Sequence, residues 1–156
     1  MFEGTKRPGT ALVVEGGGMR GIFTAGVLDV FAENGIAPFD LYMGVSAGAL
    51  TLSSYLSGQA GRNLKIMTGA CMSPQFMNFR RFLFGGHWID MDWAFETWER
   101  EWPTDIHAAL EHLAGRQFLV VCASVATGQA VYLEPRAENW IDCLRATSAL
   151  PVYYRS

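Results

Sequence analysis

Five consecutive residues in the first third of the chain have the types and spacing of a nucleophilic site. Gly44-Val45-Ser46-Ala47-Gly48 matches the GxSxG pattern, in which a serine lies on a sharp turn between a strand and a helix. Small residues are needed two positions before and after the serine, because larger side chains would collide there. The hydroxyl then stands above the sheet, and the amide of Ala47 points toward the same space. The pattern predicts a nucleophile at Ser46; the alternative is a turn of small residues with no chemistry.

A second glycine-rich segment precedes the first and directly follows a short apolar run. It comprises Gly16, Gly17, Gly18, Met19, Arg20 and Gly21. Glycines let a backbone approach a ligand closely, and the N–H groups at a helix start attract negative charge. We interpret the segment as an oxyanion loop. Two alternatives stay open, namely a tight turn without a ligand and the dinucleotide fingerprint GxGxxG. A dinucleotide site needs an acidic residue at the tip of the second strand, whereas Asp40 lies at that strand's start.

The hydrophobic pattern around these segments predicts how they are positioned. Apolar runs predict strands at residues 11–15 and 39–43, helical spacing predicts a helix over 19–33, and a small-residue helix follows Gly44 through Leu56. Strand, helix, strand and helix in this order imply parallel strands with right-handed crossovers. Both loops then leave the carboxyl ends of neighbouring strands and face one crevice. A hydroxyl facing backbone N–H donors is the arrangement that acyl transfer requires.

The remainder of the chain continues as one α/β domain without repeats or linkers. Helices are predicted at residues 62–71 and 92–102, and another from an N-cap at Thr104 to His112. The strongest strand, 117–125, turns through 126–128 into a hairpin partner at 129–133. A short helix is predicted at 139–146.

The two motifs resemble those of the patatin-like phospholipase family. Its oxyanion motif GGGxRG is matched by Gly16 to Gly21, and its elbow GxSxG by Gly44 to Gly48. Ala146-Thr147-Ser148-Ala149-Leu150-Pro151 is similar to the family's Ala-Ser-x-Ala-x-Pro stretch near the active-site wall. The resemblance runs from about residue 10 to the end of the chain. It implies an α/β three-layer sandwich with a mostly parallel central sheet, of which residues 1–156 form a single, partial domain.

The resemblance also implies a mechanism. A serine–aspartate dyad would act on a phospholipid or another acyl ester, with Ser46 as the nucleophile and the amides around Gly17 and Gly18 holding the oxyanion. A fatty acyl-enzyme would form, and water would release it. Arg20 would either brace the loop or bind a lipid phosphate, and bracing is the preferred interpretation. No metal or organic cofactor is implied.

One part of the family pattern is missing. The family's aspartate lies in an Asp-Gly-Gly or Asp-Gly-Ala motif after the alanine–proline stretch, and this chain has no Asp-Gly dipeptide. We therefore assign the base to no residue, and we expect the catalytic aspartate beyond Ser156. The 156-residue form is expected to be nearly inactive, because loss of the base in serine hydrolases costs several powers of ten in turnover. The alternative function is a non-catalytic lipid- or partner-binding module with the same fold.

Composition narrows the class of protein. The chain is 50% hydrophobic and 17% charged with a net charge of −3, which is typical of a folded globular protein. Its basic residues are scattered, which disfavours nucleic acid binding. Three cysteines without a CxxC pair indicate a reducing compartment, and Cys122 is expected to be a buried thiol. The N-terminal residues lack the apolar stretch of a signal peptide, and no run reaches the roughly 18 apolar residues of a membrane span. We expect a cytoplasmic protein that contacts membranes transiently; the oligomeric state is not predicted.

The histidines and the aromatic residues remain. We interpret His87, His107 and His112 as surface or packing residues, because none has the position of a triad base or a metal-ligand spacing. Nine aromatic residues lie between Phe76 and Trp102. They predict either a core beneath a long excursion or a hydrophobic cap over the site that contacts acyl chains or a membrane. Arg80 and Arg81 in this stretch would suit anionic head groups.

Overall fold

The computed structural model describes residues 9–150, which form a four-stranded sheet with helices packed against it. The strands are β1 (Ala11–Val14), β2 (Leu41–Val45), β3 (Gln117–Ala123) and β4 (Ala130–Leu133), and they lie in the sheet in this order. The first three are parallel, and β4 pairs antiparallel with β3. The predicted α/β fold with a mostly parallel central sheet is confirmed.

The helices occupy the connections between the strands. α1 (Gly21–Glu33) joins β1 to β2, after a 3-10 turn η1 (Gly18–Arg20), and α2 (Ala47–Leu56) follows β2. The long connection to β3 contains α3 (Arg62–Thr68), the 3-10 turn η2 (Ala70–Met72), α4 (Phe79–Leu83), α5 (Met91–Glu101) and α6 (Ile106–His112). α7 (Trp140–Ser148) follows β4.

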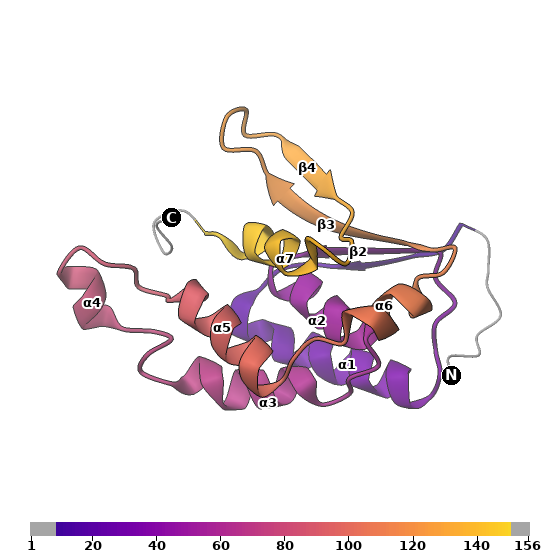
Figure 1. Ribbon diagram of the computed structural model, residues 1–156, viewed down its shortest axis with the longest axis horizontal. Coiled ribbons are helices and arrows are strands. Elements are labelled where there is room, and N and C mark those ends of the chain that lie inside the picture. The colour runs from indigo at the N-terminus through magenta and orange to yellow at the C-terminus, as the bar shows by residue number, and fades with distance from the viewer. Residues whose placement is uncertain (1–8, 151–156) are drawn as a thin grey trace.

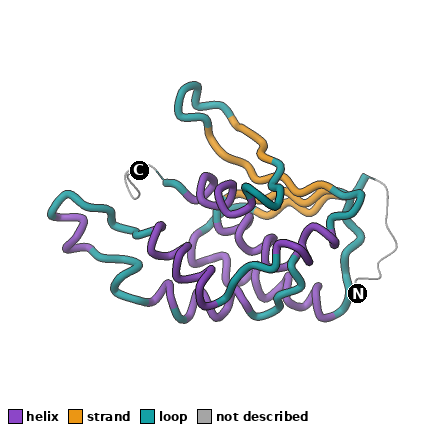
Figure 2. Tube along the Cα trace, in the orientation of Figure 1, coloured by secondary structure: helices purple, strands orange, loops and turns teal. Residues whose placement is uncertain are grey.

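The helices within residues 9–150 cover one face of the sheet (Figures 1 and 2). α2 and α7 lie directly on the strands, and α1, α3 and α6 pack against α2. Alternate strand residues such as Tyr42 and Phe118 point into this helical layer and are buried. Val13 and Val45 point to the opposite face and are exposed, Val13 by 64%. The described residues thus form two layers of the expected sandwich.

The centre of the core is α2, in which nearly every residue is buried. A helix that is surrounded on all sides needs small or apolar residues throughout. Its few hydroxyls have partners: Ser53 Oγ accepts a hydrogen bond of 2.8 Å from the indole N–H of Trp140, and that indole packs against Phe118 with ring centroids 5.4 Å apart. α2 is therefore a fixed support for the turn that precedes it.

Several element boundaries differ from the prediction. β2 is displaced by two residues, from 39–43 to Leu41–Val45, because its ladder begins where Leu41 pairs with Ala11. The N-cap of α6 is Asp105, whose carboxylate accepts from the amide of Ala108 at 3.0 Å, and not Thr104. The predicted strand at 117–125 ends at Ala123, because the hairpin turn begins at the next residue. The helix predicted over 139–146 runs from Trp140 to Ser148.

Candidate active site

Ser46 occupies the junction between β2 and α2 in a strained backbone conformation. Its φ of 51° and ψ of −126° make it the only non-glycine residue with positive φ among residues 9–150. Such a conformation costs about 1–3 kcal/mol and persists only where neighbouring structure enforces it. The flanking glycines allow that close packing. A Cβ on Gly44 would lie 2.6 Å from Ala49 Cα, and one on Gly48 would lie 2.4 Å from the carbonyl oxygen of Val14.

The first glycine loop lies beside Ser46. A Cβ added to Gly16 would be 3.1 Å from Ser46 Cβ and 3.8 Å from Ser46 Oγ, so the two loops meet at the carboxyl ends of β1 and β2. Gly18 has a φ of 54°, a left-handed conformation that favours glycine. Gly21 packs at the start of α2, where an added Cβ would lie 3.3 Å from Ala47 Cβ. The structure thus brings together both sets of residues that the sequence singled out.

Arg20 folds back over the loop that contains it. A Cβ on Gly17 would lie 3.6 Å from the Nε atom of Arg20, and the Arg20 amide donates to the Gly17 carbonyl at 3.1 Å. This placement agrees with a bracing role for Arg20. Ala47 is the first residue of α2, and an amide in the first turn has no acceptor within its own helix. The glycine loop and the first turn of α2 therefore both adjoin Ser46.

Thr147 of α7 fixes the elbow in a way that the sequence patterns did not predict. Its Oγ1 accepts a hydrogen bond of 2.8 Å from the amide of Ser46 and donates one of 2.6 Å to the carbonyl of Val121 in β3. One hydroxyl therefore connects the strained residue to the neighbouring strand. The sequence signal was only that Thr147 belongs to the alanine–proline stretch assigned to the active-site wall. Pro151 of that stretch lies outside the described residues.

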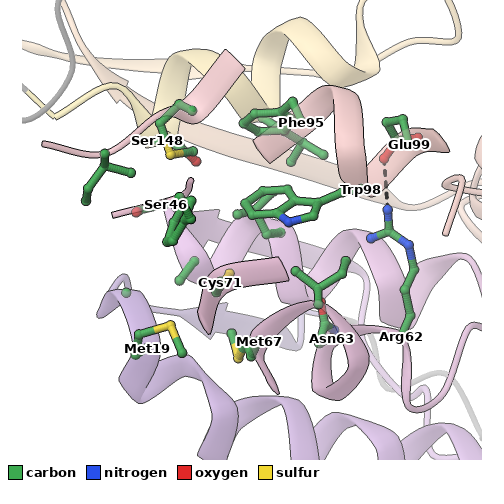
Figure 3. Close-up of a pocket in the computed structure, with 18 of the residues that line it drawn as sticks. Met19, Ser46, Arg62, Asn63, Met67, Cys71, Phe95, Trp98, Glu99 and Ser148 are labelled. Atoms are coloured by element: carbon green, nitrogen blue, oxygen red, sulfur yellow. Dashed lines mark hydrogen bonds and ion pairs between the residues drawn. The ribbon is translucent and has the colours of Figure 1, made fainter. Parts of the chain in front are cut away.

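A cavity of about 210 Å³ adjoins Ser46 (Figure 3). It lies between α2, α3, α5 and α7, and its walls are mainly apolar. The lining includes Leu50, Ile66, Met67, Phe95, Trp98 and Leu144. An elongated apolar group attached to a reacting carbonyl at Ser46 would be removed from water here.

Comparison with known proteins agrees with this geometry. The family model described as patatin-like phospholipase matches residues 12–156. The chain belongs to this family. It is also 42% identical over 147 residues to "Uncharacterized protein YjjU" of Escherichia coli (strain K12), an alignment that covers 94% of this chain and 41% of that protein. The chain spans about two fifths of the length of this curated relative. Membership places the chain in a family of lipid acyl hydrolases.

The cavity has a polar side formed by an ion pair between α3 and α5. The Arg62 guanidinium, which is 8% exposed, lies 2.8 Å from a carboxylate oxygen of Glu99 and also donates to the carbonyl of Trp102 at 2.8 Å. Burial lowers the pKa of Arg62, and the nearby carboxylate counteracts this. Figure 3 shows this pair and Ser46 on opposite sides of Trp98. The pair connects the two helices that form much of the cavity wall.

Two buried polar atoms in the cavity wall lack hydrogen-bond partners within residues 9–150. They are Ser148 Oγ and Trp98 Nε1. Ser148 lies near Ser46, on the side of the cavity formed by α7 (Figure 3). A buried polar atom without a partner is costly, so these groups are suited to bind an oxygen of a ligand or water.

No aspartate or histidine of the described part of the chain lines the cavity. Glu99 supplies the carboxylate in the cavity wall, and Arg62 and Thr104 both donate hydrogen bonds to it. Cys71 also lines the wall, and burial raises its pKa to about 12, which keeps the thiol protonated. Cys122, expected to be buried, is only partly so because it lies near the end of β3. Residues 9–150 contain no cluster of three metal-ligating side chains and no helix long and apolar enough to cross a membrane.

The three histidines lie away from Ser46. His107 is exposed on α6, and His87 lies in the segment before α5. His112 packs against Tyr42 and Tyr55, with ring centroids 5.8 Å from each. None of them borders the cavity.

Proposed function

We propose that this chain provides the nucleophile and the oxyanion loop of a serine-dependent lipid acyl hydrolase, of the phospholipase or carboxylic ester hydrolase type. One observation carries the proposal: Ser46, in a strained elbow, adjoins both the Gly16 backbone and an apolar cavity. Family membership supports the chemical class. The cavity suits the acyl part of a phospholipid or a related ester.

The proposed reaction begins when Ser46 Oγ attacks the ester carbonyl carbon. The hydroxyl proton passes to a base, and the carbonyl oxygen becomes an anion stabilised by amides of Gly17, Gly18 and Ala47. Collapse of this intermediate breaks the bond to the alcohol, which leaves with the proton and gives an acyl-enzyme on Ser46. Water then attacks the acyl carbonyl by the same route and releases the fatty acid. The reaction needs no cofactor.

The base in this proposal is an aspartate from outside residues 9–150. A serine hydroxyl without a base is a weak nucleophile, so the 156-residue form is expected to hydrolyse esters several powers of ten more slowly than a form that holds the aspartate.

We further propose that the protein is cytoplasmic, contacts membranes transiently and does not act on nucleic acid.

Covalent labelling with a fluorophosphonate tests the role of Ser46. The oxyanion loop stabilises the transition state for attack on phosphorus even when the base is absent, so we expect a slow adduct on Ser46, located by peptide mass spectrometry. Ser46→Ala should remove the adduct. Ser124→Ala is the matched control and should leave labelling unchanged, because Ser124 lies in the β3–β4 turn away from the cavity.

Two outcomes would contradict the proposal. Labelling that persists in Ser46→Ala would show that another residue reacts. A folded protein that gives no adduct at any concentration of the probe would favour the non-catalytic lipid-binding module instead.

A further inference from the structure

Residues 72–90, which we call the arm, project from the body of the molecule with α4 near the far end (Figure 1). The aromatic residues of the segment from Phe76 to Trp102 are buried at the base of the arm and exposed at its far end. Phe76 at its base is buried against Trp98, with ring centroids 6.2 Å apart. Phe79, Leu83 and Phe84 at the far end are exposed by 58%, 64% and 86%. Neither a fully buried core nor a cap lying over the site describes this arrangement.

The arm has a defined internal structure. Arg81 donates to the carbonyls of His87 at 2.9 Å and Gln75 at 3.1 Å, and its guanidinium lies 3.4 Å from the Asp90 carboxylate. The ring of Trp88 contacts Phe79 and Phe82, with centroids 6.3 Å and 6.0 Å away. The exposed side chains are therefore presented by a folded segment. Several exposed apolar side chains on such a projection indicate an interaction surface.

The charge of the arm identifies the chemistry of its partner. The arm contains a single carboxylate, Asp90, which pairs with Arg81 within the arm, whereas the whole chain has a net charge of −3. Arg81 is engaged within the arm, but Arg80 is exposed beside the apolar tip. Aromatic and aliphatic side chains next to arginine are complementary to a layer of acyl chains beneath anionic phosphates.

The arm is continuous with the cavity that contains Ser46. Phe76, Met77 and Ile89 at its base all line that cavity, and Met77 and Ile89 form a β-bridge across the arm. A lipid surface held at the tip would thus adjoin the wall of the acyl site. No residue of α1, including the exposed Phe23, lines the cavity, and α1 carries Asp29 and Glu33, which anionic lipid would repel.

We propose that the arm anchors the protein to an anionic phospholipid bilayer. Phe79, Leu83 and Phe84 enter the interface between head groups and acyl chains, and Arg80 pairs with lipid phosphates. The purpose of this anchor, delivery of lipid to Ser46, rests on the proposed function. The binding step itself does not depend on catalysis.

Vesicle sedimentation tests the proposal with the purified protein carrying Ser46→Ala, which removes any hydrolysis. Vesicles of phosphatidylcholine are compared with vesicles that also contain phosphatidylglycerol. We expect stronger binding to the anionic vesicles. Leu83→Asp combined with Phe84→Asp should lower partitioning at least about tenfold on both, because two apolar groups no longer leave water. Arg80→Glu should lower it roughly thirtyfold on anionic vesicles only, because the substitution changes the charge by two and each charge near the surface contributes about 1 kcal/mol.

The matched control is Phe23→Asp, which places the same charge at a similarly exposed aromatic residue on α1. It should leave partitioning unchanged. In protein that retains Ser46, the arm variants should keep the fluorophosphonate labelling rate, because Leu83 and Phe84 do not line the cavity. Normal vesicle binding without labelling would count against the proposed function and leave the anchor supported.

Equal partitioning of the parent and the double arm variant would overturn the anchor. So would a loss caused by Phe23→Asp alone. Failure of the parent to bind either vesicle would also overturn it and would favour a protein partner for the arm.

Discussion

Ser46 is held in a costly backbone conformation by contacts that come from three separate strands. The carbonyls at the end of β1 pack against Gly48, β2 leads into the turn, and Thr147 connects the Ser46 amide to the Val121 carbonyl of β3. A strained residue keeps its geometry only if its supports outweigh the strain. Thr147 is therefore a positioning residue for the nucleophile, since it acts through the elbow.

Replacing Thr147 by valine should loosen the elbow. Valine has a similar shape but no hydroxyl, so the Ser46 amide and the Val121 carbonyl each lose a partner, at a cost of about 1–3 kcal/mol for a buried group. We expect the rate of fluorophosphonate labelling at Ser46 to fall about tenfold, and the free energy of unfolding to fall by an amount in that range. Thr147→Ser should restore both. The matched control Thr68→Val removes an exposed hydroxyl that bonds only within α3, and it should change neither. Unchanged labelling in a folded Thr147→Val protein would contradict a positioning role.

Residue types alone predicted the glycines and the serine of this site, but not the contact that Thr147 makes with Ser46. The glycines and the serine follow local steric rules, so Gly16, Gly44, Ser46 and Gly48 could be recognised from their spacing. The contact between Thr147 and Ser46 joins residues 101 positions apart, and no local rule connects them. Pairs of this kind depend on how α7 packs on β3.

At the scale of elements, α6 is attached to the sheet and to α2 through His112. Its Nε2 atom lies 3.1 Å from the Tyr42 hydroxyl and 3.2 Å from Arg116 NH1, and since the arginine can only donate, Nε2 accepts. Burial and, to a smaller extent, the charge of Arg116 together lower the pKa of His112 to about 4. The packing of α6 thus requires a neutral imidazole.

This packing makes folding sensitive to acid. Between the ordinary histidine pKa of about 6.5 and the lowered pKa of about 4, the unfolded state binds a proton that the native state does not. The free energy of unfolding should therefore decrease as the pH falls through this window. His112→Gln, which keeps an acceptor, should weaken the dependence in urea unfolding measured between pH 7.5 and pH 5. His107→Gln is the matched control, because His107 is 84% exposed on the same helix. Its free energy of unfolding should change with pH as steeply as that of the parent. Equal slopes in all three proteins would contradict the role of His112.

Element prediction succeeded where the hydrophobic pattern was regular and failed where tertiary contacts decide. β1, α1 and α2 follow from apolar runs and helical spacing. α4 was not predicted, because five residues rich in aromatics have no clear period and are stabilised by Arg81 and by the Asn78 cap, which accepts from the Arg81 amide at 3.0 Å. Similarly, Thr104 donates to Glu99 in place of capping α6, a choice made by the position of α5.

The cavity belongs to the scale of the whole molecule, because distant parts of the chain enclose it. Met19 of η1, Ile66 of α3, Trp98 of α5 and Leu144 of α7 all contribute to its lining. The aromatic density of residues 76–102 indicated an apolar feature near the site, but its division into a buried wall and an exposed arm depends on three-dimensional packing. The volume and the polar side formed by Arg62 and Glu99 have no sequence signal.

If the cavity holds the acyl chain, a long-chain fatty acid such as oleate should bind there and stabilise the fold. At about a hundred times Kd, mass action would add about 2.7 kcal/mol and raise Tm by several degrees, whereas butyrate should have little effect. Ile66→Trp should abolish the shift, because Ile66 is buried and lines the cavity. Leu64→Trp introduces tryptophan at an exposed residue of α3, and the fatty acid should still raise Tm in this variant. Thermal unfolding followed by circular dichroism measures the shift, and the spectrum at low temperature shows whether each variant is folded. A folded Ile66→Trp protein that oleate stabilises as strongly as the parent would place the acyl site elsewhere, and Ser46 would then lack a binding surface for its substrate.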